Sequence, residues 1–188
     1  GASVPSHAPC VDDLIKLISD EFKIDASNLN LSEISGLAER KRNRHDLIAT
    51  VRSKFKGIRA KGALLNIPLY AWKSIFSTNY DELLEDAYDR ASRSLKVFSS
   101  NFDFTIQSDP AAAKLFKIHG TISKDIVDGG VSRIILTDLD YDATQDYREA
   151  LYDRLKSDIN PGTQVLIIGQ SLADQDLRDI IQRAIAIN

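Results

Sequence analysis

The stretch Phe76-Ser77-Thr78-Asn79-Tyr80-Asp81-Glu82-Leu83-Leu84 decides the fold, because a short apolar run ends there in small polar residues and a helical pattern begins at once. Residues 74–77 include β-branched and aromatic side chains, which is typical of a buried strand. From residue 80 onward apolar side chains recur at helical spacing, with acidic side chains between them. The stretch therefore predicts a strand that turns directly into a helix packed on a sheet.

Asn79 and Asp81 fall between this strand and this helix, and two interpretations are open. They can cap the helix, because Asn and Asp side chains accept hydrogen bonds from the free N–H groups at a helix start. They can also face a ligand, because ligands in open α/β sheets bind outside the carboxyl ends of the strands. His119 and Gly120 end another predicted strand, and Gly169 follows a third, so the sequence favours the ligand interpretation.

Length and composition are those of one soluble globular domain. The 188 residues are 43% hydrophobic and 27% charged. A formal net charge of −3 predicts no general attraction to nucleic acid or to an anionic membrane, and no run approaches the ~20 apolar residues of a membrane helix. The single cysteine, Cys10, excludes an internal disulfide and a four-cysteine zinc site.

The amino-terminal third divides into a loop with its helix and a basic segment. Residues 1–9 are rich in small residues and lead into an amphipathic helix, a combination that can cradle a phosphate group. Residues 24–66 have short helical patterns, and we interpret them as a helical insert. Its basic residues, between positions 40 and 61, predict a solvated helix surface, with a nucleic-acid or partner-binding face as the alternative. Phe55 is the one aromatic side chain there that could stack on bases.

Strand and helix patterns alternate along the rest of the chain. Short apolar runs predict strands at residues 95–98, 113–118, 133–137 and 165–168. The last of these is a continuous apolar run, typical of a strand buried on both faces. Helical patterns follow over residues 138–159 and around residues 177–185. This alternation is typical of a parallel, doubly wound α/β sheet.

Five short motifs occur in the order in which they occur in the sirtuin superfamily, which the chain resembles. They are Gly1-Ala2-Ser3 with Ser6 and Pro9, Thr78-Asn79-Tyr80-Asp81, Lys117-Ile118-His119-Gly120, Thr137-Asp138-Leu139-Asp140-Tyr141 and Gly169-Gln170-Ser171-Leu172 with Asp174. The resemblance is strongest to the sirtuin-like domains of bacterial antiphage systems. It implies a Rossmann-like α/β fold over residues 1–188, with the helical insert at 24–66. In the family a first strand precedes the first motif, so we expect that strand upstream of Gly1.

The resemblance also implies roles for individual residues. Asn79 would lie beside the nicotinamide ribose of NAD and hold water or the ribose near the anomeric carbon. Asp81 would accept a hydrogen bond from the nicotinamide carboxamide. His119 would bond a ribose hydroxyl and act as general base. The remaining contacts to NAD would come from Gly1, Ala2, Ser3, Ser6, Pro9, Thr78, Gly120, Gly169, Ser171, Leu172 and Asp174.

Two departures from the protein-deacylating sirtuins favour hydrolysis. Those enzymes usually carry a four-cysteine zinc module, and they follow the proline of the first loop with Asp-Phe-Arg, where this chain has Cys10-Val11-Asp12. We therefore expect an NAD⁺ glycohydrolase, with NAD as substrate and no metal. The resemblance implies a cytoplasmic, homo-oligomeric effector of a bacterial immune protein, with other domains or subunits of a defence complex as partners. The alternatives are a non-catalytic sensor of NAD or ADP-ribose and an NAD-dependent protein deacylase.

Overall fold

The computed structural model describes residues 2–107, 109–125, 133–160, 162–169 and 175–186. Within them a three-stranded parallel sheet has the order β1-β3-β2, built from β1 (Ile75–Ser77), β2 (Leu95–Phe98) and β3 (Ala113–Lys117). The predicted α/β class and the parallel sheet are confirmed. The central strand is the last of the three in the sequence. Because both strand pairs are parallel, each connection has to cross back over the sheet, and such crossovers usually contain a helix.

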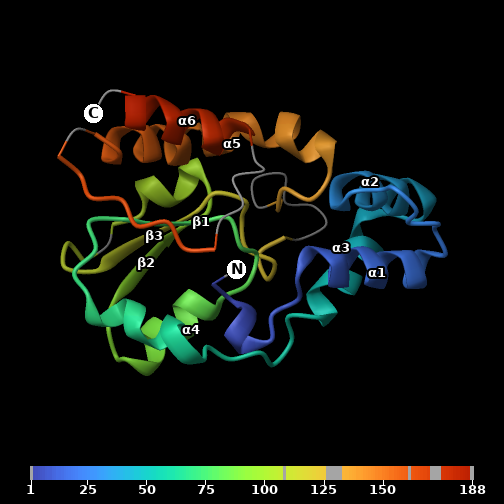
Figure 1. Cartoon of the computed structure of the whole chain (residues 1–188), viewed down its shortest axis with the longest axis horizontal. Helices are drawn as coiled ribbons and strands as arrows, with labels where there is room; N and C mark the ends of the chain where they lie inside the picture. Colours follow the sequence, from blue (N-terminus) through green and yellow to red (C-terminus); the bar gives the residue numbers. More distant parts are fainter. Residues whose placement is uncertain (1, 108, 126–132, 161, 170–174, 187–188) are drawn as a thin grey trace.

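Helices cover both faces of the sheet (Figure 1). The helix α4 (Leu83–Arg90) lies on one side with the 3-10 segment η2 (Gly62–Leu69), and the long helix α5 (Asp138–Asp158) lies on the other side with α6 (Gln175–Ala186). Side chains alternate along β3, which directs Phe116 to α5 and Lys117 to α4.

Three phenylalanines, one from each strand, stack across the face that α5 covers. Phe76 and Phe98 both pair with Phe116 in the strand register, and their ring centroids lie 4.9 and 4.8 Å from that of Phe116. Leu151 of α5 packs on this stack. Offset aromatic pairs at this spacing stabilise a sheet beyond the area they bury.

A second apolar cluster joins three amino-terminal helices beside the sheet (Figure 1). They are α1 (Val11–Phe22), α2 (Leu31–Lys41) and α3 (Arg44–Ser53). The expected helical character of residues 24–66 agrees with α2, α3 and the start of η2. Ile122, Ile134 and Leu136 complete this cluster, so its core continues into the segments that follow β3.

Two predicted strands are wrong. Residues 165–168 belong to no strand of the described chain, and their exposed fractions run from 46% to 65%. Residues 133–137 are largely buried but lie outside the sheet; the Ile134 N–H bonds a carboxylate and the Ile135 N–H bonds the His119 carbonyl. An apolar run predicts burial or strand propensity, whereas a strand also needs a neighbour that satisfies its backbone groups.

No helix in the described ranges is long and apolar enough to cross a lipid bilayer.

Candidate functional site

The turns that follow β1 and β3 lie side by side at the carboxyl edge of the sheet. The Ile118 N–H donates to Ser77 O at 2.9 Å, and the Ile122 N–H donates to Tyr80 O at 3.0 Å. These backbone bonds align the two polar turns over several residues. The prediction that the Thr78-Asn79 and His119-Gly120 positions share one edge of the sheet is confirmed.

Ser3 links the amino-terminal loop to the turn after β1. Its Oγ donates to Asp81 Oδ2 at 2.8 Å and accepts a hydrogen bond of 2.8 Å from Asn79 Nδ2. Ser3 and Asp81 are both buried. Asn79 and Asp81, two residues apart in the chain, are thus connected through one hydroxyl group from a distant loop.

Asp81 accepts a hydrogen bond from a free N–H at the helix start, although Glu82 occupies the N-cap position, whereas Asn79 makes no such bond. Asp81 Oδ1 accepts from the Leu83 N–H at 3.1 Å, at the first residue of α4, whereas the Asn79 amide donates to Ser3. The Asp81 carboxylate thus accepts one bond at each oxygen, from the Leu83 N–H at Oδ1 and from the Ser3 hydroxyl at Oδ2. A carboxylate has about four acceptor positions, so Asp81 retains capacity for a ligand donor.

His119 is half-buried between two tyrosine rings. Its ring centroid lies 6.5 Å from that of Tyr80 and 6.2 Å from that of Tyr141, the second contact being edge-on. The Tyr80 hydroxyl donates to Ile135 O at 2.6 Å, and the Ile135 N–H donates to His119 O at 3.0 Å. Tyr141 belongs to the first turn of α5, so the Thr137–Tyr141 motif reaches the same site as His119.

Gly120 is a glycine for two local reasons. Its φ of +83° is in the left-handed region, and a Cβ atom there would lie 2.6 Å from Arg148 Nη2. Arg148 is buried on α5; its Nη1 donates to Ile118 O at 2.9 Å, and its Nη2 donates to Arg133 O. Arg148 thereby holds the chain on both sides of the His119-Gly120 turn.

The sequence interpretation assigned no role to Arg148 or to Lys117, although Lys117 is the first residue of one of the five motifs. Arg148 lies three and seven residues before Leu151 and Leu155, in the apolar stripe of its helix, and Lys117 lies in a parallel strand. Each is a charged residue at a position where the pattern predicts an apolar one, and this could have indicated a buried, paired charge. Lys117 is buried against the start of α4, where it donates to the Asp81 backbone oxygen.

The other residues that we expected to contact NAD lie in several different environments. Ser6 is buried and its Oγ accepts from the Lys61 N–H at 2.9 Å, so it anchors the loop to the segment before η2. Ala2 packs at the edge of the apolar cluster of α4 and η2, and Pro9 is partly exposed. Gly169 is exposed with a φ of +64°. Four predicted contacts lie outside the described residues: Gly1, Ser171, Leu172 and Asp174.

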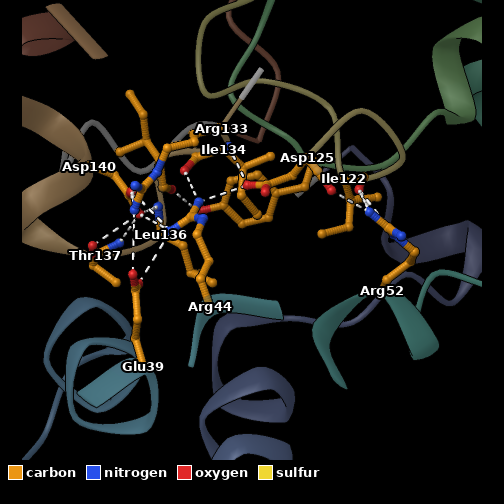
Figure 2. A network of polar contacts seen from close by, with 12 residues as sticks. Glu39, Arg44, Arg52, Ile122, Asp125, Arg133, Ile134, Leu136, Thr137 and Asp140 are labelled. Atoms are coloured by element: carbon orange, nitrogen blue, oxygen red, sulfur yellow. Dashed lines mark hydrogen bonds and ion pairs between the residues drawn. The ribbon is translucent and has the colours of Figure 1, made fainter. Parts of the chain in front are cut away.

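A buried polar network connects the amino-terminal helices to the site (Figure 2). Arg44, at the start of α3, bonds Asp125 Oδ2 at 2.7 Å, Asp140 Oδ1 at 3.0 Å and the Ile134 carbonyl at 3.1 Å. Arg133 also pairs with Asp140, at 2.8 Å. Charge-assisted bonds to Arg44 thereby fix two residues to α3. They are Asp140, next to Tyr141 in α5, and Asp125, in the segment that follows His119.

Asp140 is the anion at the centre of this network. Burial alone raises the pKa of Asp140, but the Arg44 charge, the N–H groups of Thr137 and Leu136, and the Arg133 charge outweigh it, so that the pKa lies below its ordinary value. The Thr137 N–H bond to Asp140 Oδ2, at 2.8 Å, also closes the start of α5. The carboxylate is therefore held ionised although its side chain is 0% exposed.

The expectation of a solvated surface agrees with most of the basic residues between 40 and 61, which are exposed, but not with Arg44, which is buried. Arg52 is exposed and still donates hydrogen bonds to the carbonyls of Ile122 and Asp125. Two other members, Lys56 and Arg59, line a cleft of about 710 Å³ between the loop after α3 and the start of α4. Spacing along the helix could not show these contacts, because the acceptors come from residues far along the chain.

Comparison with known proteins assigns a family. A model of the SIR2-like domain matches residues 73–188, more than half of the chain. The chain belongs to the SIR2-like domain family. The matched range of this SIR2-like domain runs from the residues before β1 to the end of the chain, and so includes Asn79, Asp81 and His119. A search of the curated proteins gave no match.

Members of the SIR2-like family are in general NAD-dependent enzymes, so this domain has an NAD-related function. Ser3, which completes the hydrogen-bond chain, precedes the matched range. Within the described ranges, no group of three or more His, Cys, Asp and Glu side chains is arranged to hold a metal ion.

Proposed function

We propose that the chain is an NAD⁺ glycohydrolase domain, which hydrolyses NAD⁺ to nicotinamide and ADP-ribose. The observation that carries the proposal is the chain of hydrogen bonds from Asn79 through Ser3 to Asp81, at the same sheet edge as His119. It joins an amide and a carboxylate, at a sheet edge that also carries an imidazole, in a domain whose family uses NAD. These groups supply the contacts that nicotinamide, ribose and water need.

Each of the three side chains has a separate task. Asp81 accepts a hydrogen bond from the carboxamide of nicotinamide and so fixes the ring. Asn79 donates its amide N–H to Ser3, which directs the amide oxygen to a water molecule or a ribose hydroxyl. His119 accepts the proton of the attacking water. The ribose–nicotinamide bond breaks with its electron pair on nicotinamide, which leaves as a neutral molecule, and the water oxygen bonds the anomeric carbon.

Positioning is the main contribution of such a site. The bond to a cationic pyridinium is already weakened, and the reaction passes through an oxocarbenium-like state, so the protein gains most by orienting water and by fixed dipoles. The hydrogen bonds through Ser3 and the backbone bonds between the two turns provide that rigidity. As an NAD-consuming domain, the chain would act as a cytoplasmic, oligomeric effector of a bacterial antiphage protein, a role supported by the motif set it shares with such domains.

The test is nicotinamide release by the full-length protein from NAD⁺, measured with and without an acylated peptide. We expect release that needs no peptide and that falls by at least about a hundredfold in Asn79→Ala and in His119→Ala. Matched controls are Asn66→Ala and His45→Ala, both at exposed positions away from the site. Release that requires the peptide would show a deacylase, and NAD⁺ binding without turnover would show a sensor; either result contradicts the proposal.

A further inference from the structure

Lys117 is a buried cation in the sheet. It is the last residue of β3 and is 1% exposed. Strands of a parallel sheet covered on both faces are usually apolar, and burial of an unpaired ammonium group is strongly unfavourable. A lysine at this position therefore needs partners that hold its charge.

The two partners of Lys117 lie just before α4 and in its first turn. Its Nζ donates to the backbone oxygen of Asp81 and lies 3.6 Å from Glu85 Oε1. Burial raises the pKa of Glu85, and the Lys117 charge opposes that rise. The acidic side chains of the pattern after residue 80 suggest a solvent-facing side of the helix, but Glu85 is only 21% exposed and pairs with Lys117.

We propose that Lys117 is a positioning residue that holds Asp81 in place for the substrate; as a statement about catalysis, this rests on the proposed NAD⁺ hydrolysis. Asp81 is held at three points: Lys117 bonds its carbonyl, the Leu83 N–H bonds Oδ1, and Ser3 bonds Oδ2. The first bond fixes the peptide, and the other two fix the carboxylate. Without Lys117 the peptide between Asp81 and Glu82 is free to rotate, and the carboxylate moves with it.

The substitution that tests this is Lys117→Met, which keeps much of the length of the side chain and removes the donor. Lys114→Met is the matched control, because Lys114 is a partly exposed lysine in the same strand. Hydrogen–deuterium exchange should show faster amide exchange over residues 79–83 in Lys117→Met only, with exchange in α5 unchanged. Equal exchange over residues 79–83 in wild type and Lys117→Met would overturn the inference, whether or not the protein hydrolyses NAD⁺.

Kinetic measurements distinguish a positioning role of Lys117 from a general effect of Lys117 on the stability of the fold. We expect kcat/KM for NAD⁺ to fall by about tenfold to a hundredfold in Lys117→Met, because small displacements of a substrate contact have effects of that size. In an Asp81→Asn background the same substitution should cause little further loss, since its effect passes through Asp81. An equal loss in both backgrounds would overturn the inference.

Two results keep this inference distinct from the proposed function. If the wild-type protein does not release nicotinamide while Lys117→Met still changes exchange over residues 79–83, the glycohydrolase proposal fails and the hold of Lys117 on Asp81 stands. If Lys117→Met does not fold, NMR of the wild-type ammonium group decides: a persistent bond to Asp81 slows proton exchange of the Lys117 ammonium, and rapid exchange would overturn the inference.

Discussion

Asn79 and Asp81 are joined through one hydroxyl group, that of Ser3, by two hydrogen bonds of 2.8 Å each. An ionised carboxylate can only accept, so the Ser3 proton is directed to Asp81, and the Ser3 oxygen must receive its bond from a donor. That donor is the NH₂ group of Asn79. The orientation of the Asn79 amide therefore follows from the charge of Asp81, and in the proposed function its oxygen is the atom that would face the ligand.

Removal of the Ser3 hydroxyl should disturb both partners at once. In Ser3→Ala, the charged carboxylate of Asp81 loses the bond that it accepts from the hydroxyl, of a kind that contributes about 1.5–3 kcal/mol, and the Asn79 amide is free to turn over. We expect kcat/KM for NAD⁺ to fall by about tenfold to a hundredfold. Ser53→Ala, at an exposed serine that bonds its own helix, is the control. An unchanged rate of nicotinamide release in Ser3→Ala would contradict the orientation argument.

Gly120→Ala should destabilise the fold through two separable effects. The substitution places a Cβ atom 2.6 Å from Arg148 Nη2 at a φ of +83°. Gly57→Ala is the matched control, since Gly57 has a φ of +77° and a Cβ there meets nothing within 4 Å. Left-handed strain costs about 1–3 kcal/mol in both variants. Urea unfolding should show a larger loss for Gly120→Ala; equal losses would mean that Arg148 moves aside without cost.

Stability should depend on pH through Asp140. Because the pKa of Asp140 in the folded protein lies below the ordinary value of 3.8, the folded state binds this proton less tightly than the unfolded state. The contribution of Asp140 is thus complete above that value and is lost as the pH falls through the folded-state pKa. Unfolding free energies at several pH values should differ most between wild type and Asp140→Asn above about pH 4 and converge below it. A constant difference would show that its charge is not coupled to Arg44.

Arg44 should matter for stability far more than other arginines of the amino-terminal helices. Arg44→Met leaves Asp125 and Asp140 buried with fewer partners, and breaking a buried pair costs about 3–5 kcal/mol. Arg40→Met, at an exposed position of α2, should change the free energy of unfolding by less than about 0.5 kcal/mol. Thermal or chemical unfolding of both variants checks this; similar values for the two would assign Arg44 to the solvated surface after all.

The elements that the sequence predicted well are those whose patterns are local. The strand at residues 95–98 and the helix that begins at residue 138 agree with β2 and with the start of α5, because β-branched runs and helix-start signals act over a few residues. The sharing of one sheet edge by Asn79 and His119 also followed from topology alone.

The parts that could not be predicted depend on contacts between distant residues. The burial of Arg44 requires carboxylates 81 and 96 residues further along the chain. Ser3 reaches a partner 78 residues away, and the exposure of residues 165–168 depends on which neighbour their backbone finds. Periodicity contains no information on such partners, so the sequence predicted candidate site residues without predicting the bonds that they make.

The stack of Phe76, Phe116 and Phe98 also determines which side chains reach the site. Side chains alternate strictly along β3, so a slip of its pairing by one residue would move Phe116 to the α4 side and turn Lys117 toward α5. The same slip would remove the Lys117 ammonium from the Asp81 carbonyl and bury it among apolar residues. Aromatic packing on one face of the sheet thus favours the strand register on which the Lys117 contact with Asp81, on the opposite face, depends.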